Sequence, residues 1–229
     1  MTQSYKRIAV FALAAVASVG LLAAPAQAQS EQQKLVNAAN KTLSNFLRDP
    51  DMTWLQNNIG SAKGVLVAPE IVKAGFVFGG SGGRAVLVAH EAPAGKWGGP
   101  AFYTLATASV GFQAGVSVSE NVTLVMTEKG LNSLLANSVK LGGDASVAAG
   151  PVGVGAKSDV VADLVTFSRA KGVYGGLNLD GTVVAPANDW NNAYYGKNVL
   201  PPDILIRQSV HSKQADPLLT LVTKATKKK

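Results

Sequence analysis

The sequence predicts an α+β fold, in which a curved antiparallel β-sheet, either barrel-like or made of two packed sheets, carries N-terminal, middle and C-terminal helices. Apolar residues recur at helical spacing near both ends of the chain, and the spacing changes to two between Lys63 and Val184. Many expected strands carry glycine or alanine at every second position, which lets another backbone approach closely and favours a curved sheet. Only 15% of the residues are charged, and a helical bundle needs more charge on its exposed faces.

Residues 1–28 have the organisation of a signal peptide of the bacterial type. A short basic segment precedes an apolar run over residues 8–24, and Ala26-Gln27-Ala28 matches a signal-peptidase site, which makes Gln29 the expected mature N-terminus. The alternative is a membrane anchor, for which the run is only marginally long. The sequence contains no cysteine, so the fold relies on packing rather than on disulfides. We therefore expect a periplasmic or secreted protein, peripheral at a membrane if it binds one.

The chain divides into four expected segments. These are the signal peptide (1–28), N-terminal amphipathic helices (29–60), the main sheet domain (61–200), and a C-terminal helical segment with a basic tail (201–229). The formal net charge is +7, and removal of the signal takes away Lys6 and Arg7. Four of the remaining positive charges lie in the last six residues, so the body of the protein is nearly neutral. A neutral body argues against nucleic acid as a partner.

Helical segments are expected on both sides of the sheet region. Ser30–Arg48 is amphipathic, and Ser30 with Gln33 fits a capping box. Its apolar stripe either packs on the domain or lies on a membrane surface. Proline at position 50 ends this helix and a shorter one follows, up to Gly60. Further helices are expected over 128–137, with Thr127 as the cap, and over 203–208 and 217–226, where proline stands near each start.

Strands are expected through most of the region between these helices. The clearest alternation of apolar and small or polar residues extends from Val110 to Val118, and Ser119-Glu120-Asn121 then suggests a turn before a strand over 122–126. Turns or bulges are expected at Gly79–Gly83 and Gly150–Gly155. Other strand segments are expected at residues 65–67, 76–78, 84–89, 145–149, 164–169 and 173–179.

The sequence offers little for catalysis or metal binding. Gly79–Gly83 matches the G-x-S-x-G nucleophile elbow and His211 follows downstream, but an elbow requires a helix after Ser81 and the next residues favour a strand. A serine hydrolase is therefore a minor alternative to a non-enzymatic protein. Two distant histidines and no cysteine argue against a metal site, and we expect no cofactor.

A few charged residues lie in otherwise apolar, glycine-rich surroundings. Asp144 and Arg169 could form an internal ion pair or line a polar head-group site, because charges in such places tend to be paired or exposed for a purpose. Lys63, Arg84, Arg169 and Lys171 are candidates for a phosphate-binding patch if the strand ends converge.

Several long segments, in the correct order from about Trp54 to Gly196, resemble the SYLF domain. They are AKGVLVAPEIVKAGFVFGGSGGR (Ala62–Arg84), KWGGPAFYTLATASVGFQAGV (Lys96–Val116), KLGGDASVAAGPVG (Lys140–Gly153), FSRAKGVYGGLNLDG (Phe167–Gly181) and NAYYG (Asn192–Gly196).

The resemblance implies a lipid-binding module without catalysis. Members from eukaryotes are linked to phosphoinositides, membrane remodelling and actin, and use an amphipathic N-terminal helix for lipid contact. The equivalent stretch here carries Lys34, Lys41 and Arg48. We expect an anionic glycerophospholipid or a membrane surface as the partner, while protein partners remain unspecified. The alternative is a structural or protein-interaction module of the cell envelope that has no lipid ligand.

Overall fold

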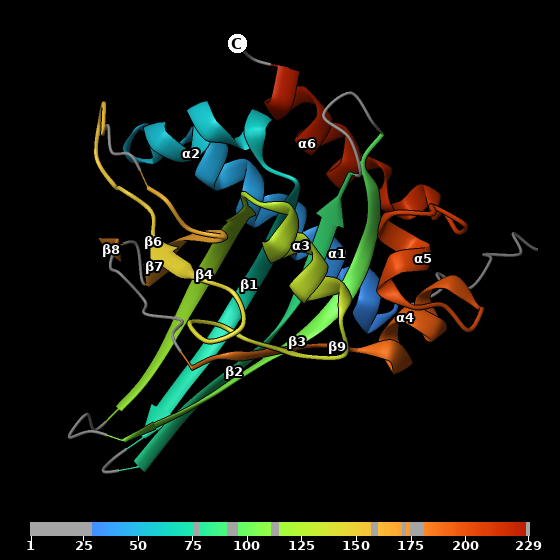
Figure 1. Ribbon diagram of the computed structural model, residues 1–229, viewed down its shortest axis with the longest axis horizontal. Coiled ribbons are helices and arrows are strands. Elements are labelled where there is room, and N and C mark those ends of the chain that lie inside the picture. The colour runs from blue at the N-terminus through green and yellow to red at the C-terminus, as the bar shows by residue number, and fades with distance from the viewer. Residues whose placement is uncertain are drawn as a thin grey trace, which may run out of the picture.

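The computed structural model describes residues 29–75, 78–90, 96–110, 115–156, 160–170, 173–174 and 181–227. The expected signal peptide and the candidate cation Lys171 lie outside these residues. The described part is α+β, as predicted, with one curved sheet and helices on both of its faces (Figure 1).

One sheet holds all the described strands, in the order β5-β9-β3-β2-β1-β4-β7-β6, with β8 paired to β7. Neighbouring strands are antiparallel except for the β6–β7 pair, and the sheet curls into a half-barrel rather than two packed sheets (Figure 1). The strands are β1 (Gly64–Gly75), β2 (Phe78–Ala89), β3 (Gly98–Val110), β4 (Gly115–Val125), β5 (Val139–Lys140), β6 (Val147–Ala149), β7 (Leu164–Ala170), β8 (Val173–Tyr174) and β9 (Val183–Pro186).

The helices form two groups that cover opposite faces of the sheet. One core includes side chains from α1, α2 and α6, and the other includes side chains from α3 and α5. Figure 1 shows α1 behind the sheet and α3 in front of it. The helices are α1 (Glu31–Arg48), α2 (Thr53–Asn58), α3 (Glu128–Leu135), α4 (Asn188–Tyr195), α5 (Pro201–Leu205) and α6 (Asp216–Lys227), with short 3-10 turns at Pro50–Met52, Ile59–Ser61 and Lys213–Ala215.

Helix α1 is an integral part of the fold. Its N-terminus is capped as predicted, because the Ser30 hydroxyl accepts a hydrogen bond from the Gln33 backbone N–H at 3.2 Å. The Gln33 side chain does not complete the expected capping box, since it binds Asn37 and the Gln214 carbonyl instead. The apolar stripe, which includes Leu43 and Phe46, is buried in the first core. The packing interpretation of this stripe is therefore confirmed.

The glycine run at Gly79–Gly83 was expected as a turn or a bulge, and the turn is wrong. All five residues lie inside β2 and pair with β1 on one side and β3 on the other. Strand β1 has a bulge beside Glu70, and a Cβ atom at Gly83 would collide with the Glu70 carbonyl oxygen. Glycine at position 83 thus allows the backbones of β1 and β2 to approach closely within the sheet, and it does not mark a reversal of the chain.

Two other strand boundaries differ from the prediction. Val110 ends β3 and Gly115 begins β4, which runs in the opposite direction, so the expected single strand from Val110 to Val118 is wrong. The predicted turn at Ser119-Glu120-Asn121 is also wrong, because these residues lie in β4 and pair with β7. Alternation of side chains continues in both strands, so periodicity alone does not mark where the chain reverses.

The four long strands β1 to β4 extend beyond the helices at one end of the molecule (Figure 1, lower left). Strand β9 pairs with β3 only from Tyr103 to Ala106, and β7 pairs with β4 only from Ser119 to Val125. This end of the sheet is therefore narrower than the body and, among the described residues, carries no helix.

Candidate functional site

A groove of about 380 Å³ runs between α1 and the sheet and contains two of the predicted cations. Helix α1 contributes one wall, which includes Lys34, Leu35, Ala38, Lys41 and Thr42. The opposite side consists of Pro69 and Glu70 at the β1 bulge, Glu120 of β4 and Trp190 of α4. Lys34 and Lys41 reach this groove because they are seven residues apart on α1, which places them on one helix face, two turns from each other.

Arg84 adjoins the groove through Trp190. Its guanidinium carbon lies 3.9 Å from the centre of the Trp190 ring, and Arg84 stands opposite Glu70 in the pairing of β1 with β2. Stacking on an aromatic ring holds the guanidinium in place, and one of its outer nitrogens also donates a long hydrogen bond, at 3.5 Å, to the Thr104 hydroxyl. The groove thus combines an aromatic side chain, apolar side chains and two lysines of α1, and Arg84 of β2 stands beside it.

The acidic residues of the groove are mostly neutralised by neighbouring cations. Lys34 forms an ion pair with Glu31 at 2.6 Å, and Glu120 forms one with Arg169 at 2.6 Å. Among the described residues Lys41 makes no ion pair. The groove is therefore of mixed charge rather than strongly basic.

Arg169, another predicted cation, connects three parts of the fold. Its guanidinium binds Glu120 of β4, lies 3.6 Å from an Asp49 carboxyl oxygen, and stands over the Phe46 ring at 5.0 Å. The expected pairing with Asp144 is wrong, because Asp144 accepts a hydrogen bond from the Lys140 backbone in its own turn. Only 19% of the Arg169 side chain is exposed, so the residue fixes the end of α1 against the sheet.

The remaining predicted cations lie apart from the groove lining. Lys63 forms an ion pair with Glu128 at 2.7 Å, which connects the start of β1 to the start of α3. Arg48 is exposed in the last turn of α1. The strand ends therefore do not bring Lys63, Arg84 and Arg169 into one phosphate patch. The groove instead holds Lys34 and Lys41 on one wall, and Arg84 stands beside it against Trp190.

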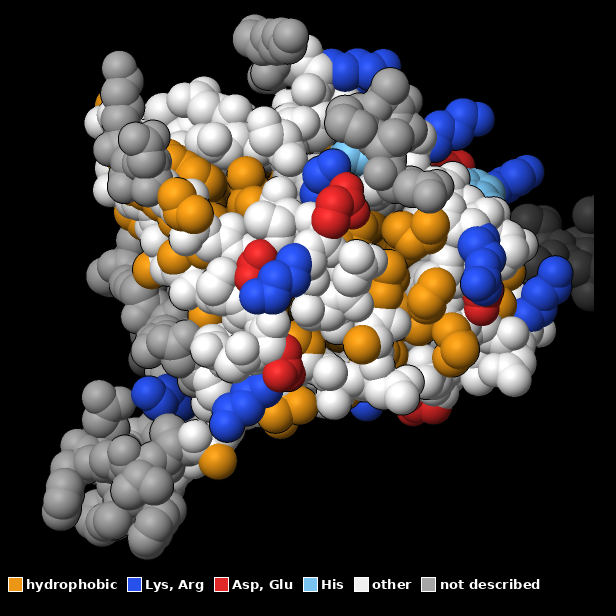
Figure 2. All heavy atoms as spheres, in the orientation of Figure 1, with side chains coloured by type: hydrophobic (Ala, Val, Ile, Leu, Met, Phe, Trp, Pro, Cys, Tyr) orange, Lys and Arg blue, Asp and Glu red, His pale blue; other side chains and the backbone are white. Residues whose placement is uncertain are grey.

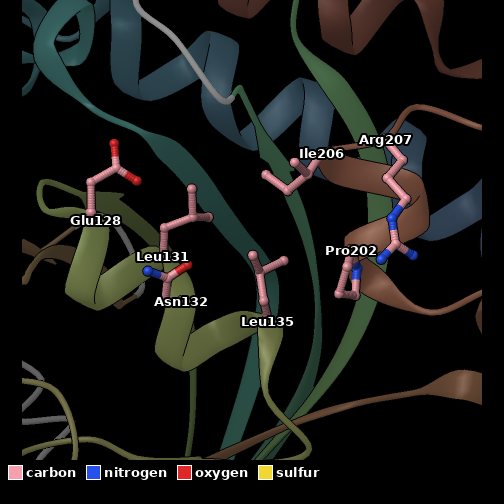
Figure 3. Close-up of a pocket in the computed structure, with 7 residues that line it drawn as sticks. All are labelled: Glu128, Leu131, Asn132, Leu135, Pro202, Ile206 and Arg207. Carbon is pink, nitrogen blue, oxygen red and sulfur yellow. The ribbon is translucent and has the colours of Figure 1, made fainter.

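A second hollow, of about 260 Å³, lies between α3 and α5 on the other face of the sheet (Figure 3). Leu131, Leu135, Pro202 and Ile206 give it an apolar lining, and Glu128 and Arg207 stand at its rim. Arg207 forms an ion pair with Asp203, whose pKa lies below its usual range because it accepts hydrogen bonds from the Leu200 backbone and from Arg207. Figure 2 shows hydrophobic side chains gathered in this region, interrupted by adjacent cationic and anionic side chains.

The structure does not support the nucleophile-elbow alternative. Ser81 lies within β2 rather than at a strand-to-helix turn, and His211 forms a pair with Asp216 at 3.1 Å. Within the described ranges no group of three or more acidic or histidine side chains could hold a metal ion. In the same ranges, the helices are all too short or too polar to cross a bilayer.

Sequence reasoning missed the acidic and aromatic members of the groove. Glu120 was placed in a turn, although it continues the two-residue alternation of Val116 and Val118 on the same side of β4. Nothing in the sequence shows that α4 brings Trp190 to Arg84.

A family model described as "Las17-binding protein actin regulator" (Ysc84) matches residues 106–225, which is more than half of the chain. The chain belongs to the Ysc84 family. The resemblance to the SYLF domain is thereby confirmed. The family's description refers to binding and regulation rather than to catalysis.

Curated relatives of the Ysc84 family are similar over most of this chain. SH3 domain-containing YSC84-like protein 1 of Homo sapiens is 27% identical over 210 residues, which cover 89% of this chain and 61% of the relative. Protein YSC84 of Saccharomyces cerevisiae is 30% identical over 168 residues, covering 70% of this chain and 36% of the relative. LAS seventeen-binding protein 3 of the same yeast is 28% identical, with 86% and 44% covered. The chain thus spans between about a third and two-thirds of these relatives.

Proposed function

We propose that this Ysc84-family protein is an exported, non-enzymatic protein that binds anionic phospholipid at a membrane surface. The observation that carries the proposal is the groove beside α1, which is lined by Lys34, Lys41 and Trp190 and has Arg84 stacked on Trp190. Ammonium and guanidinium groups bind phosphate oxygens through charge-assisted hydrogen bonds, and the adjacent apolar side chains suit the glycerol and upper acyl region of a lipid. Export is inferred from the organisation of residues 1–28.

The mixed charge of the groove sets the strength of this binding. Two of its glutamates already have cationic partners, so Lys41 and Arg84 would bear most of the phosphate contact. Exposed charges are screened over about 8–10 Å at physiological salt. We therefore expect modest affinity that weakens as salt is added.

Vesicle co-sedimentation tests the proposal with the chain that begins at Gln29. Both described cores draw on residues between Leu35 and Ala225, so this chain keeps them whole. Lys41→Glu reverses a charge in the groove, and Lys140→Glu makes the same change at an exposed position on β5. We expect Lys41→Glu to weaken binding to phosphatidylglycerol vesicles about tenfold, by loss of a phosphate contact and repulsion. Lys140→Glu should change it less than about twofold. Equal effects of the two variants would contradict a role for the groove.

A protein partner is the second candidate function. The family description and the name LAS seventeen-binding protein 3 refer to binding of a protein by relatives. The hollow between α3 and α5 offers apolar side chains for such a contact, with charges at its rim. Protein binding that survives Lys41→Glu and fails in Leu135→Asp would favour this function over lipid binding.

A further inference from the structure

The narrow end of the sheet has an uncharged face that no described element covers. Strand pairing aligns two rows across β4, β1, β2 and β3, and residues paired directly across a sheet share a face. We call this the valine–alanine face; its rows are Val118, Val72, Gly82 and Ala106, followed by Val116, Ala74, Gly80 and Ala108. The six residues with side chains are all exposed, and Val116 reaches 68%.

The opposite face of the same strands is polar. Between the two rows, the pairing aligns Ser117, Lys73, Ser81 and Thr107, whose side chains point the other way. The two faces therefore differ in chemistry over the same short length of sheet, and only one of them consists of methyl groups and glycine.

The valine–alanine face adjoins the groove directly. The next row toward the body of the molecule lies two residues further along each strand, so it shares the valine–alanine face. It consists of Glu120, Glu70, Arg84 and Thr104. Glu120 and Glu70 line the groove, and Arg84 stacks on Trp190. If the polar part of a ligand lies in the groove, the adjoining part of the same ligand would therefore lie against the valine–alanine face.

The composition of this face indicates what covers it. None of the side chains on this face can donate or accept a hydrogen bond. An entirely apolar partner is therefore complementary to it. The valine–alanine face is four strands wide, at about 4.8 Å per strand, and two rows long. Its area is therefore on the order of 270 Å². A stable protein interface needs about 800 Å² from each partner, so this face alone is too small for a second copy of the chain.

We infer that the valine–alanine face contacts the hydrocarbon of the lipid surface while the groove holds the head groups. The inference rests on the proposed function and specifies which surface enters the lipid. The outer edge of β4 is not paired by a described strand along these rows, and that of β3 is not paired by one beyond Ala106. Unpaired backbone groups need water, so the sheet end enters only the interfacial layer, to a depth of about 5–10 Å.

Single cysteines test this orientation, because the protein has none of its own. Val116→Cys places a thiol on the valine–alanine face, and Ser117→Cys places one on the polar face of the same strand. Each variant, starting at Gln29, is labelled with a nitrobenzoxadiazole dye and mixed with phosphatidylglycerol vesicles. The dye at position 116 should brighten at least about twofold and shift to the blue, because hydrocarbon excludes water from it. The dye at position 117 should change much less.

Co-sedimentation of the same samples separates the outcomes. Binding with equal dye responses at the two positions would overturn the inference and leave the proposed function standing. If the unlabelled protein did not bind the vesicles, both the inference and the proposed function would be wrong. A dye response at position 116 that follows protein concentration without vesicles would assign the face to a second copy and overturn the inference. In parallel, Val116→Asp should weaken vesicle binding at least about tenfold, as expected for one lost apolar side chain, whereas Ser117→Asp should not.

Discussion

Arg169 of β7 and Glu120 of β4 form an ion pair at 2.6 Å, and the same guanidinium reaches Asp49 at the end of α1. Thr42 of α1 also donates a hydrogen bond to Glu120, at 3.1 Å. These contacts anchor α1 to the sheet beside the groove. The position of Lys34 and Lys41 therefore depends on a residue that the sequence suggested as a lipid ligand.

We expect Arg169→Met to destabilise the protein by about 2 kcal/mol, because it leaves Glu120 without its partly buried counter-charge. Urea unfolding followed by circular dichroism measures this loss. The double variant Arg169→Met/Glu120→Gln should lose less than the sum of the two single variants. Strict additivity would show that the pair does not stabilise the fold.

Gly83→Ala should destabilise the protein by about 2 kcal/mol, since the added methyl group meets the Glu70 carbonyl at the β1 bulge. Gly82→Ala is the matched control, because its Cβ would lie at an ordinary 3.5 Å from the Leu105 oxygen. We expect the control to be neutral or slightly stabilising. Similar melting temperatures for both variants would argue against the close approach at Gly83.

Asn121→Val should stabilise the protein by about 1 kcal/mol. Both polar atoms of the Asn121 amide are buried without a hydrogen-bond partner, and removing such a group relieves its desolvation cost. Thr123→Val, two residues along the same face, should do the opposite, because its hydroxyl is paired with that of Thr166 at 2.8 Å. Thermal denaturation of the two variants measures both effects. A lower melting temperature in Asn121→Val would contradict the expected stabilisation.

The pKa of the Asp163 carboxyl lies well below its usual range, chiefly because it accepts hydrogen bonds from the Thr127 hydroxyl and the Ser146 backbone, with Lys129 adding a favourable charge. Because folding lowers this pKa, the ionised carboxylate stabilises the protein at pH values above the carboxyl's pKa in the unfolded chain, which is about 3.9. The contribution is lost as the pH falls below that value. The free energy of unfolding should decline between about pH 5 and pH 2, and less steeply in Asp163→Asn. An unchanged slope in the variant would assign the acid sensitivity to other groups.

The sequence predicted the parts of the fold that depend on local chemistry. Ser30 and Thr127 cap α1 and α3 as expected. The strands at residues 65–67 and 84–89, the second of which is buried from Ala85 onward, follow from short apolar runs. Gly79–Gly83 was misread because glycine marks both turns and close strand contacts, and only the bulge in β1 distinguishes them. The groove could not be predicted, because its residues come from α1, β1, β4 and α4 and meet only through the order of the strands.

Flotation of the chain from Gln29 with phosphatidylglycerol or phosphatidylcholine vesicles tests the central claim most directly. Lipid binding through the groove predicts that the protein rises with the phosphatidylglycerol vesicles, rises less with phosphatidylcholine, and returns to the bottom fraction as salt approaches about 0.5 M. Protein that stays at the bottom with both lipids at every salt concentration would contradict lipid binding.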